Sequence, residues 1–196
     1  MYKSLPNLVL GFHGCDIETY NTVLHENKNL TLSNNAHDWL GNGIYFWENS
    51  YDRALEWSQS HCKTKPAVIG AIIELGYCLN LSDFGSTEIL RIGYDLLKLE
   101  CENTSTQLPI NRDTKNNTDL LIRELDCAVI QRIHNFNRES KFESYDSIRG
   151  IFIEGKQVYE NSGFMEKTHV QLCVANPNCI KGYFSPRFSD NQYSRV

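Results

Sequence analysis

The sequence predicts an α+β fold in a single domain that covers residues 1–196. Apolar runs typical of β-strands lie near both ends of the chain, and amphipathic patterns typical of helices lie between them, without the regular alternation of a doubly wound sheet. Hydrophobic residues make up 41% of the chain and aromatic residues 11%, which is enough for a core. Residues after 186 are polar, and we expect them to form a frayed tail.

The first part of the chain alternates short apolar runs with helical patterns. β-Branched residues favour a strand at 67–75, and Ser50 is a good N-cap for a helix that begins at Tyr51. The elements expected here are strands at 7–12, 43–47 and 67–75 and helices at 16–26 and 51–61, with a turn-rich segment at 30–40.

The rest of the chain carries the strongest helical pattern. Leu121, Leu125, Val129 and Ile133 repeat at helical spacing, which predicts a helix over 119–136. The remaining expected elements are an amphipathic helix at 87–100, a long polar surface loop at 102–117, and strands at 148–153, 169–174 and 180–184.

Composition excludes several classes of protein. The net charge of −5 argues against a nonspecific nucleic-acid binder, which usually has a basic face. The longest apolar stretch, 66–75, is too short to span a membrane, and the N-terminus lacks the apolar core of a signal peptide. Seven cysteines without a CxxC pair indicate free thiols in the cytoplasm, with Cys127 and Cys173 in apolar runs as core residues.

Two short segments carry the functional signal. The first is Gly11-Phe12-His13-Gly14-Cys15, and the second, about thirty residues later, is Gly41-Asn42-Gly43-Ile44-Tyr45-Phe46-Trp47, followed by Ser50, Ala54 and Trp57. Cleavage of NAD at its nicotinamide–ribose bond needs aromatic faces for the cationic ring, close backbone for the carboxamide, and a polar group near the ribose 2′-OH of an oxocarbenium-like transition state. Both segments offer such groups.

In this order the segments resemble the nicotinamide-binding core of the diphtheria-toxin/PARP class of ADP-ribosyltransferases. The resemblance implies two small antiparallel or mixed sheets around an NAD cleft, with flanking helices. It implies that His13 binds the ribose 2′-OH, that the Gly14 backbone pairs with the carboxamide, and that Tyr45 and Trp57 hold the ring, with Phe12 and Gly43 also in the NAD site. The chain departs from PARPs at Arg53, where they have a serine, and at Glu56, where they have a tyrosine.

The third catalytic element of that class is a glutamate at the start of a late strand, and its positional match here is Gln171. Gln171 can bond a ribose hydroxyl but carries no negative charge, so the neighbouring Glu154, Glu160 and Glu166 are alternatives. Residues 149–155, 159, 169–174 and 176–184 also resemble a pattern found in uncharacterised bacterial proteins. Asp126 and Arg149 could line the cleft or pair structurally.

The expected function is transfer of ADP-ribose from NAD, as co-substrate and without a metal, to a macromolecular acceptor, either protein or nucleic acid, with release of nicotinamide. Bacterial proteins of this kind are often toxins, effectors or defence proteins. The alternatives are an inactive NAD- or ADP-ribose-binding module, an RNA 2′-phosphotransferase, and a protein that only keeps the fold.

Other motifs in the same segments give weaker signals. Gly41-Asn42-Gly43 lacks the Lys-Ser/Thr of a P-loop, and no second pair at zinc spacing accompanies His13 and Cys15. A Cys15–His13 nucleophilic pair is conceivable, but no third residue orients it.

Overall fold

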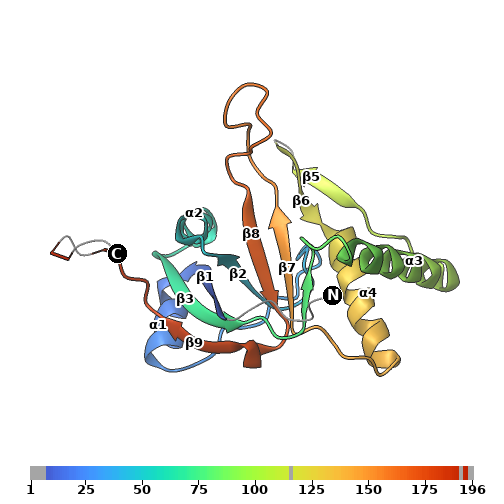
Figure 1. The fold of residues 1–196 in the computed structure, drawn as a ribbon, viewed down its shortest axis with the longest axis horizontal. Coiled ribbons are helices and arrows are strands. Elements are labelled where there is room, and N and C mark those ends of the chain that lie inside the picture. Colours follow the sequence, from blue (N-terminus) through green and yellow to red (C-terminus); the bar gives the residue numbers. More distant parts are fainter. Residues whose placement is uncertain (1–7, 115–116, 190–191, 194–196) are drawn as a thin grey trace.

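The computed structural model of the protein describes residues 8–114, 117–189 and 192–193 (Figure 1). Its fold is mixed α+β. In chain order the elements are β1 (Leu8–Asp16), α1 (Ile17–His25), β2 (Ile44–Glu48), α2 (Tyr51–His61), β3 (Pro66–Glu74), β4 (Cys78–Asn80), α3 (Ser86–Thr104), β5 (Asn111–Thr114), β6 (Asn117–Arg123), α4 (Glu124–Glu139), β7 (Ser147–Phe152), β8 (His169–Val174), the short 3-10 helix Pro177–Cys179, and β9 (Ile180–Phe184).

Seven strands form one sheet in the order β4-β7-β8-β2-β1-β3-β9, and β5 and β6 form a separate two-stranded ribbon. All neighbours in the large sheet are antiparallel except β4 and β7. The sheet has a narrow joint, because β1 and β2 pair at only two positions, Gly11 with Glu48 and Phe12 with Trp47. Two half-sheets, β9-β3-β1 and β2-β8-β7-β4, are therefore fused at this joint, where two separate sheets were expected.

Helices cover both faces of the sheet. Ile44 and Phe46 of β2 point toward the face covered by α1, where they join the core with Val23. Tyr45, between them, points to the opposite face and packs with Ile130 of α4. This opposite face also carries α2, whose Ala54 packs with Trp47. The alternation of β2 thus places Tyr45 and Trp47 on the face shared by α2, α3 and α4.

Three expected boundaries are wrong. β1 continues to Asp16, so His13 lies inside the strand instead of after it. The helix expected at 119–136 begins at Glu124, because residues 117–123 form β6. The loop expected at 102–117 holds the end of α3 and all of β5. Residue 7 of the first expected strand and residues 115–116 of this loop lie outside the described residues.

The ribbon formed by β5 and β6 explains the last two differences. Asn111 pairs with Arg123 across the ribbon, and its side-chain oxygen accepts hydrogen bonds from the backbone N–H groups of Leu125 (3.0 Å) and Asp126 (3.2 Å). Arg112 forms an ion pair with Glu124. The polar residues of 111–123 therefore make a strand pair that caps the first turn of α4, and strand pairing overrides the helical spacing of this segment.

Other expectations are confirmed. The helix at 51–61 and the strands at 169–174 and 180–184 have the expected bounds, although the Ser50 side chain does not cap α2. All seven cysteines are free, and Cys127 and Cys173 are buried.

The segment after residue 186, expected to be frayed, contacts the rest of the protein through an aromatic ring. Phe188 lies edge-on to Tyr51 at 5.4 Å between ring centroids, while residues 190–191 and 194–196 are outside the described part. No helix among the described residues is long and apolar enough to cross a membrane.

We predict that Gly14→Ala lowers the free energy of unfolding by about 1–3 kcal/mol, the usual cost of overpacking. A Cβ at Gly14 would lie 2.2 Å from the carbonyl oxygen of Ala54, which is helix backbone and cannot swing away. Gly182→Ala is the matched control, because a Cβ there meets nothing within 4 Å. Urea unfolding of both variants measures the difference, and equal stabilities would contradict the tight β1–α2 contact.

Candidate functional site

The site expected from the sequence lies where β1 and β2 separate. β1 continues past Phe12 toward Asp16 and β2 begins at Ile44, but no pairing joins them beyond Phe12 and Trp47. His13 bridges this split, with its Nδ1 donating to the carbonyl oxygen of Tyr45 at 2.8 Å. Because the carbonyl can only accept, Nδ1 carries the proton and Nε2 of the neutral ring is an acceptor. Burial lowers the pKa of His13, which favours this neutral form.

Tyr45 uses its hydroxyl to hold the preceding turn. The hydroxyl donates to the carbonyl oxygen of Gly41 at 2.8 Å and accepts from the backbone N–H of Leu40 at 2.9 Å. Burial raises the pKa of this phenol, so it stays protonated. The ring is half-buried against the core beneath α4. Tyr45 therefore has a structural role that is independent of any ligand.

The other residues of the two segments are also in close packing. A Cβ at Gly43 would lie 2.5 Å from Sγ of Cys173 and 2.7 Å from the carbonyl oxygen of Val174. Phe12 contacts the rings of Tyr51 and Phe184 edge-on, with centroids 5.9 and 6.3 Å away. Close strand and helix packing thus accounts for glycine at 14 and 43, and it leaves the backbone edge of β1 beyond Phe12 as the part of the site without a β2 partner.

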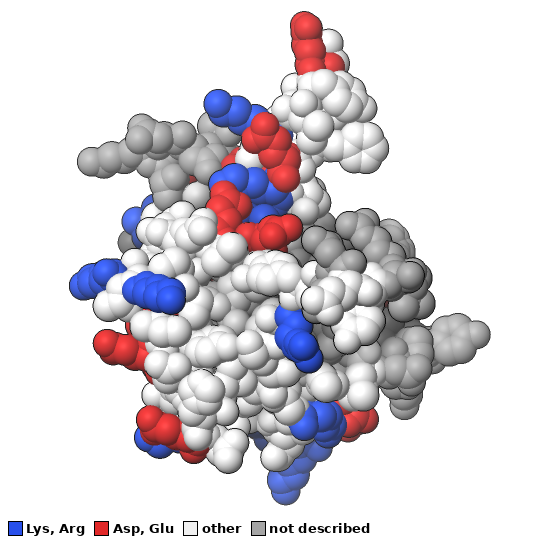
Figure 2. All heavy atoms as spheres, turned by 90° about the vertical axis from the view of Figure 1, so that its left-hand side faces the viewer, with Lys and Arg blue, Asp and Glu red and all other residues white. Residues whose placement is uncertain are grey.

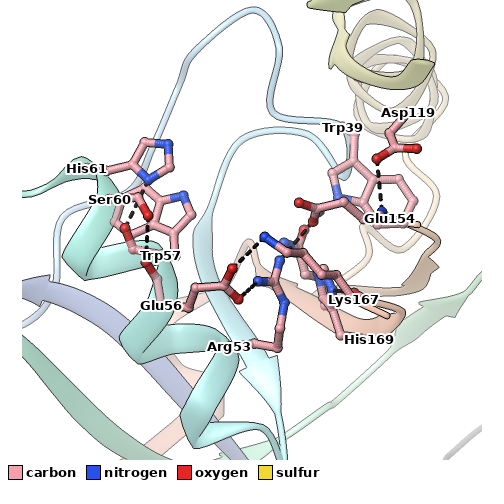
Figure 3. Close-up of polar contacts among 12 residues, drawn as sticks. Trp39, Arg53, Glu56, Trp57, Ser60, His61, Asp119, Glu154, Lys167 and His169 are labelled. Carbon is pink, nitrogen blue, oxygen red and sulfur yellow. Dashed lines mark hydrogen bonds and ion pairs between the residues drawn. The ribbon is translucent and has the colours of Figure 1, made fainter. Parts of the chain in front are cut away.

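The structure does not bring together the two rings expected to sandwich nicotinamide. Trp57 is 38% exposed and stacks on His61 of its own helix, with centroids 4.6 Å apart and planes 8° apart. It contacts Trp47 (5.8 Å) but, among the described residues, makes no ring contact with Tyr45. Figure 3 places Trp57 and His61 together on α2, away from Trp39. The aromatic residue inside the site is Trp47, which is 6% exposed.

Gln171 lies on the same face as Tyr45 and Trp47. Its register partners are Trp47 on β2 and Gly150 on β7, and Tyr45 pairs with the next residue of β8 on this face. The Gln171 side-chain oxygen accepts from Nε1 of Trp39 at 2.6 Å. Sheet order therefore brings the third expected position next to the strand of Tyr45 and two strands from that of His13, and an indole fixes the orientation of its amide.

Trp39 belongs to an aromatic and cationic group that sequence analysis missed. Its ring contacts Phe152 edge-on at 5.3 Å. The Arg123 guanidinium lies over both rings, 4.9 Å from the Trp39 centroid and 4.3 Å from that of Phe152. Burial lowers the pKa of Arg123. Trp39 stands in a polar, turn-rich segment and Arg123 in an expected helix, so neither position gave a signal in the sequence.

A network of ion pairs joins α2 to the segment between β7 and β8 (Figure 3). Arg53 contacts Glu56 and lies 2.8 Å from Glu154, and Glu56 also pairs with Lys167. Hydrogen bonds from Lys167 and then Arg53 lower the pKa of Glu56. Of the three glutamates considered as substitutes, only Glu154 lies at this network.

Glu160 and Glu166 are exposed on the segment between β7 and β8, which projects from the sheet (Figure 1). Figure 2, which views the side that carries α1, α2 and β3, shows basic and acidic side chains interleaved near the top of this face, below a protruding segment. The Arg53 and Lys167 pairs therefore fasten the base of the segment to α2.

His169, expected only as part of the strand at 169–174, is a further residue of the site. It is 7% exposed, stacks on Phe152 at 5.5 Å, and lies 6.2 Å from the ring of Trp47. Its Nδ1 donates to the carbonyl oxygen of Lys167 at 2.6 Å, so Nε2 is an acceptor. His169 Nε2, Trp47 Nε1 and Arg53 Nε are buried without a hydrogen-bond partner among the described residues. Burial lowers the pKa of His169 to about 4.

Asp126 and Arg149 have structural partners. Arg149 forms a two-pronged ion pair with Glu48, at 2.6 and 3.0 Å, and Asp126 accepts from the Asn111 amide at 2.8 Å. Over the described ranges, no three His, Cys, Asp or Glu side chains gather as a metal site would require.

Comparison with known proteins finds an archaeal protein of similar sequence. The chain is similar to the uncharacterized protein MJ0359 of Methanocaldococcus jannaschii, at 27% identity over 192 residues that cover 87% of this chain and 83% of the archaeal protein. No protein-family model matches the chain, and no solved structure gives a significant match. The name of this relative assigns no activity, so a functional proposal depends on the geometry of the site.

We predict that His169 makes the protein lose stability between pH 6.5 and about 4. The unfolded state, with the ordinary pKa of 6.5, takes up a proton before the folded state, whose His169 pKa is about 4. The contribution is therefore fully present above pH 6.5 and is lost as the pH falls to about 4, by about 3 kcal/mol at most.

Unfolding by urea at several pH values tests this. His169→Gln should flatten the fall in unfolding free energy, and His25→Gln, an exposed site on α1, should keep it. An identical pH slope in wild type and His169→Gln would show that His169 is not buried as a neutral ring.

Proposed function

We propose that the protein is an NAD-dependent mono-ADP-ribosyltransferase, with an ADP-ribosyltransferase-like fold whose NAD cleft begins at the split between β1 and β2. The observation that carries the proposal is the order of three strands. β1, β2 and β8 are neighbours, and they carry His13, Tyr45 and Gln171, which are far apart in the sequence. The two-pair joint and the split beyond it support a ligand at the backbone edge of His13 and Gly14.

The chemistry follows from the donors and acceptors at the split. Nε2 of neutral His13 is an acceptor for a ribose hydroxyl, and the β1 edge at Gly14 offers peptide groups to a carboxamide. Loss of nicotinamide leaves positive charge on the ribose, so a fixed acceptor near the 2′-OH stabilises the transition state more than the ground state. Gln171, held by Trp39, is the second fixed acceptor or donor of the proposal. It lies two strands from His13, on the face of Tyr45 and Trp47, while the His13 ring contacts Phe46 of the other face at 5.8 Å between centroids, so both groups would have to reach the ligand around the split.

The product is ADP-ribose on a macromolecular acceptor, protein or nucleic acid, with release of nicotinamide. A role as a bacterial toxin, effector or defence protein, acting in the cytoplasm, belongs to the same proposal. It rests on the order of the two sequence segments together with the adjacency of their strands.

A second candidate is a module that binds NAD or ADP-ribose without transfer. One observation favours it: the third position carries an uncharged amide, while the nearby Glu56 and Glu154 are bound to Arg53 and Lys167. A carboxylate already neutralised by a cation stabilises an oxocarbenium ion less. Nicotinamide release distinguishes the two candidates, because only the enzyme produces it.

We predict that purified protein releases nicotinamide from labelled NAD, and that His13→Ala lowers the rate about 100-fold or more, the usual effect of removing a transition-state hydrogen bond. His25→Ala, on the exposed end of α1, is the matched control and should keep the wild-type rate. Calorimetry should show NAD binding by wild type. Binding without release would support the binding module, and absence of both would overturn the proposal.

We also predict that Gln171→Glu raises the rate of nicotinamide release about tenfold, while Gln171→Leu lowers it. The glutamate keeps an oxygen for the Trp39 N–H and adds negative charge beside the developing cation. Rates are compared at saturating NAD. If the two variants change the rate in the same direction, Gln171 does not act on the transition state.

A further inference from the structure

A cavity of about 570 Å³ lies between α3, α4 and Trp39, outside the split between β1 and β2. The helices approach closely at Gly93, where a Cβ would lie 2.5 Å from Ile133, and the cavity lies beside this contact. Its size falls in the range of small-molecule sites, about 300–1,000 Å³. Neither the sequence motifs nor the proposed NAD site at the split accounts for it.

The residues that line the cavity indicate which kind of apolar group it could bind. Aliphatic side chains are the largest group in its lining, and Leu90, Leu125 and Val129 are among them. Two aromatic rings, Trp39 and Tyr94, stand at the same cavity. A flat apolar group would bury its surface against both kinds of wall, as aromatic ligands commonly do.

Arg123 is the lining residue that would bind a polar group of the ligand. Its guanidinium lines the cavity over the Trp39 ring, and burial lowers its pKa. Its carboxylate neighbour, Asp126, is 3.9 Å away and already accepts from Asn111 at 2.8 Å. Arg91, Asp95 and Asp126 also line the cavity, so the charges of its lining balance, and Arg123 Nε donates to the carbonyl oxygen of Leu120 at 3.0 Å. The guanidinium is nevertheless desolvated and has no closer ion pair among the described residues than Asp126, so an anionic group in the cavity would bind it at short range.

We propose that this cavity binds a planar aromatic compound that carries an anionic group, with the ring between the aliphatic walls and Trp39 and the anion on Arg123. The Trp39 indole that would contact the ligand is the one whose N–H holds Gln171 at 2.6 Å. Occupancy of the cavity therefore acts on the orientation of the Gln171 amide on β8. The binding site itself does not depend on the proposed transferase activity.

The test uses two fluorescent probes of the same shape on the full chain. Anilinonaphthalene sulfonate has the flat body and the anion, and phenylnaphthylamine has the body alone. Arg123→Gln should weaken binding of the sulfonate about tenfold and change binding of the neutral probe less than twofold. Arg112→Gln, whose ion pair with Glu124 lies outside the cavity lining, is the matched control and should change neither.

Leu90→Trp, which places a bulkier side chain in the cavity, should weaken binding of both probes, with circular dichroism and thermal unfolding to confirm that the variant is folded. If both probes bind the folded Leu90→Trp variant as they bind wild type, or if Arg123→Gln weakens them equally, the proposal is overturned. An ADP-ribose competition then identifies the source of the anion. Displacement of the sulfonate in wild type assigns the cavity to the dinucleotide, and no displacement assigns it to a separate aromatic anion.

Discussion

The arrangement of the site depends on the short joint between β1 and β2. Two residue pairs hold the half-sheets together, and immediately beyond them the strands part and His13 spans the gap to the Tyr45 carbonyl. A full ladder at this place would occupy the peptide groups of β1 and close the edge to any ligand. Packing is close around the joint, since Trp47 of one pair is buried with Phe12 packed against it, and α2 lies directly on Gly14.

This joint also explains why so many polar groups of the site are tied to the protein. The Tyr45 hydroxyl, the Gln171 amide and the Arg53 guanidinium each hold a neighbouring segment in place. The loops on either side of the joint receive little support from strand pairing. These hydrogen bonds and ion pairs support them instead. The same bonds orient the groups before any ligand arrives, and preorganised groups stabilise a transition state without a reorganisation cost.

The sequence predicted the α+β class and the elements with strong local patterns, such as the helix at 51–61 and the strand at 169–174. It missed the ribbon of β5 and β6, because Asn111 and Arg123 are polar and their pairing depends on partners twelve residues apart. It could not find Trp39 or Arg123 as neighbours of Gln171, because their proximity arises from sheet order and helix placement, which no local spacing encodes. His169 is different, since it precedes Gln171 by two residues on the expected strand and shares its face. The departures at Arg53 and Glu56 were visible and mark the ion-pair network.

The connection from β4 to β7 has a consequence for the evolution of this protein. It contains α3, the ribbon and α4, yet it leaves and re-enters the sheet at neighbouring positions, since Cys78 pairs with Ser147. An excursion whose two ends are adjacent can be lengthened, trimmed or exchanged while the strands that carry His13, Tyr45 and Gln171 keep their register. The segment that holds the two helices can therefore change in length or sequence without a change in the pairing of the strands.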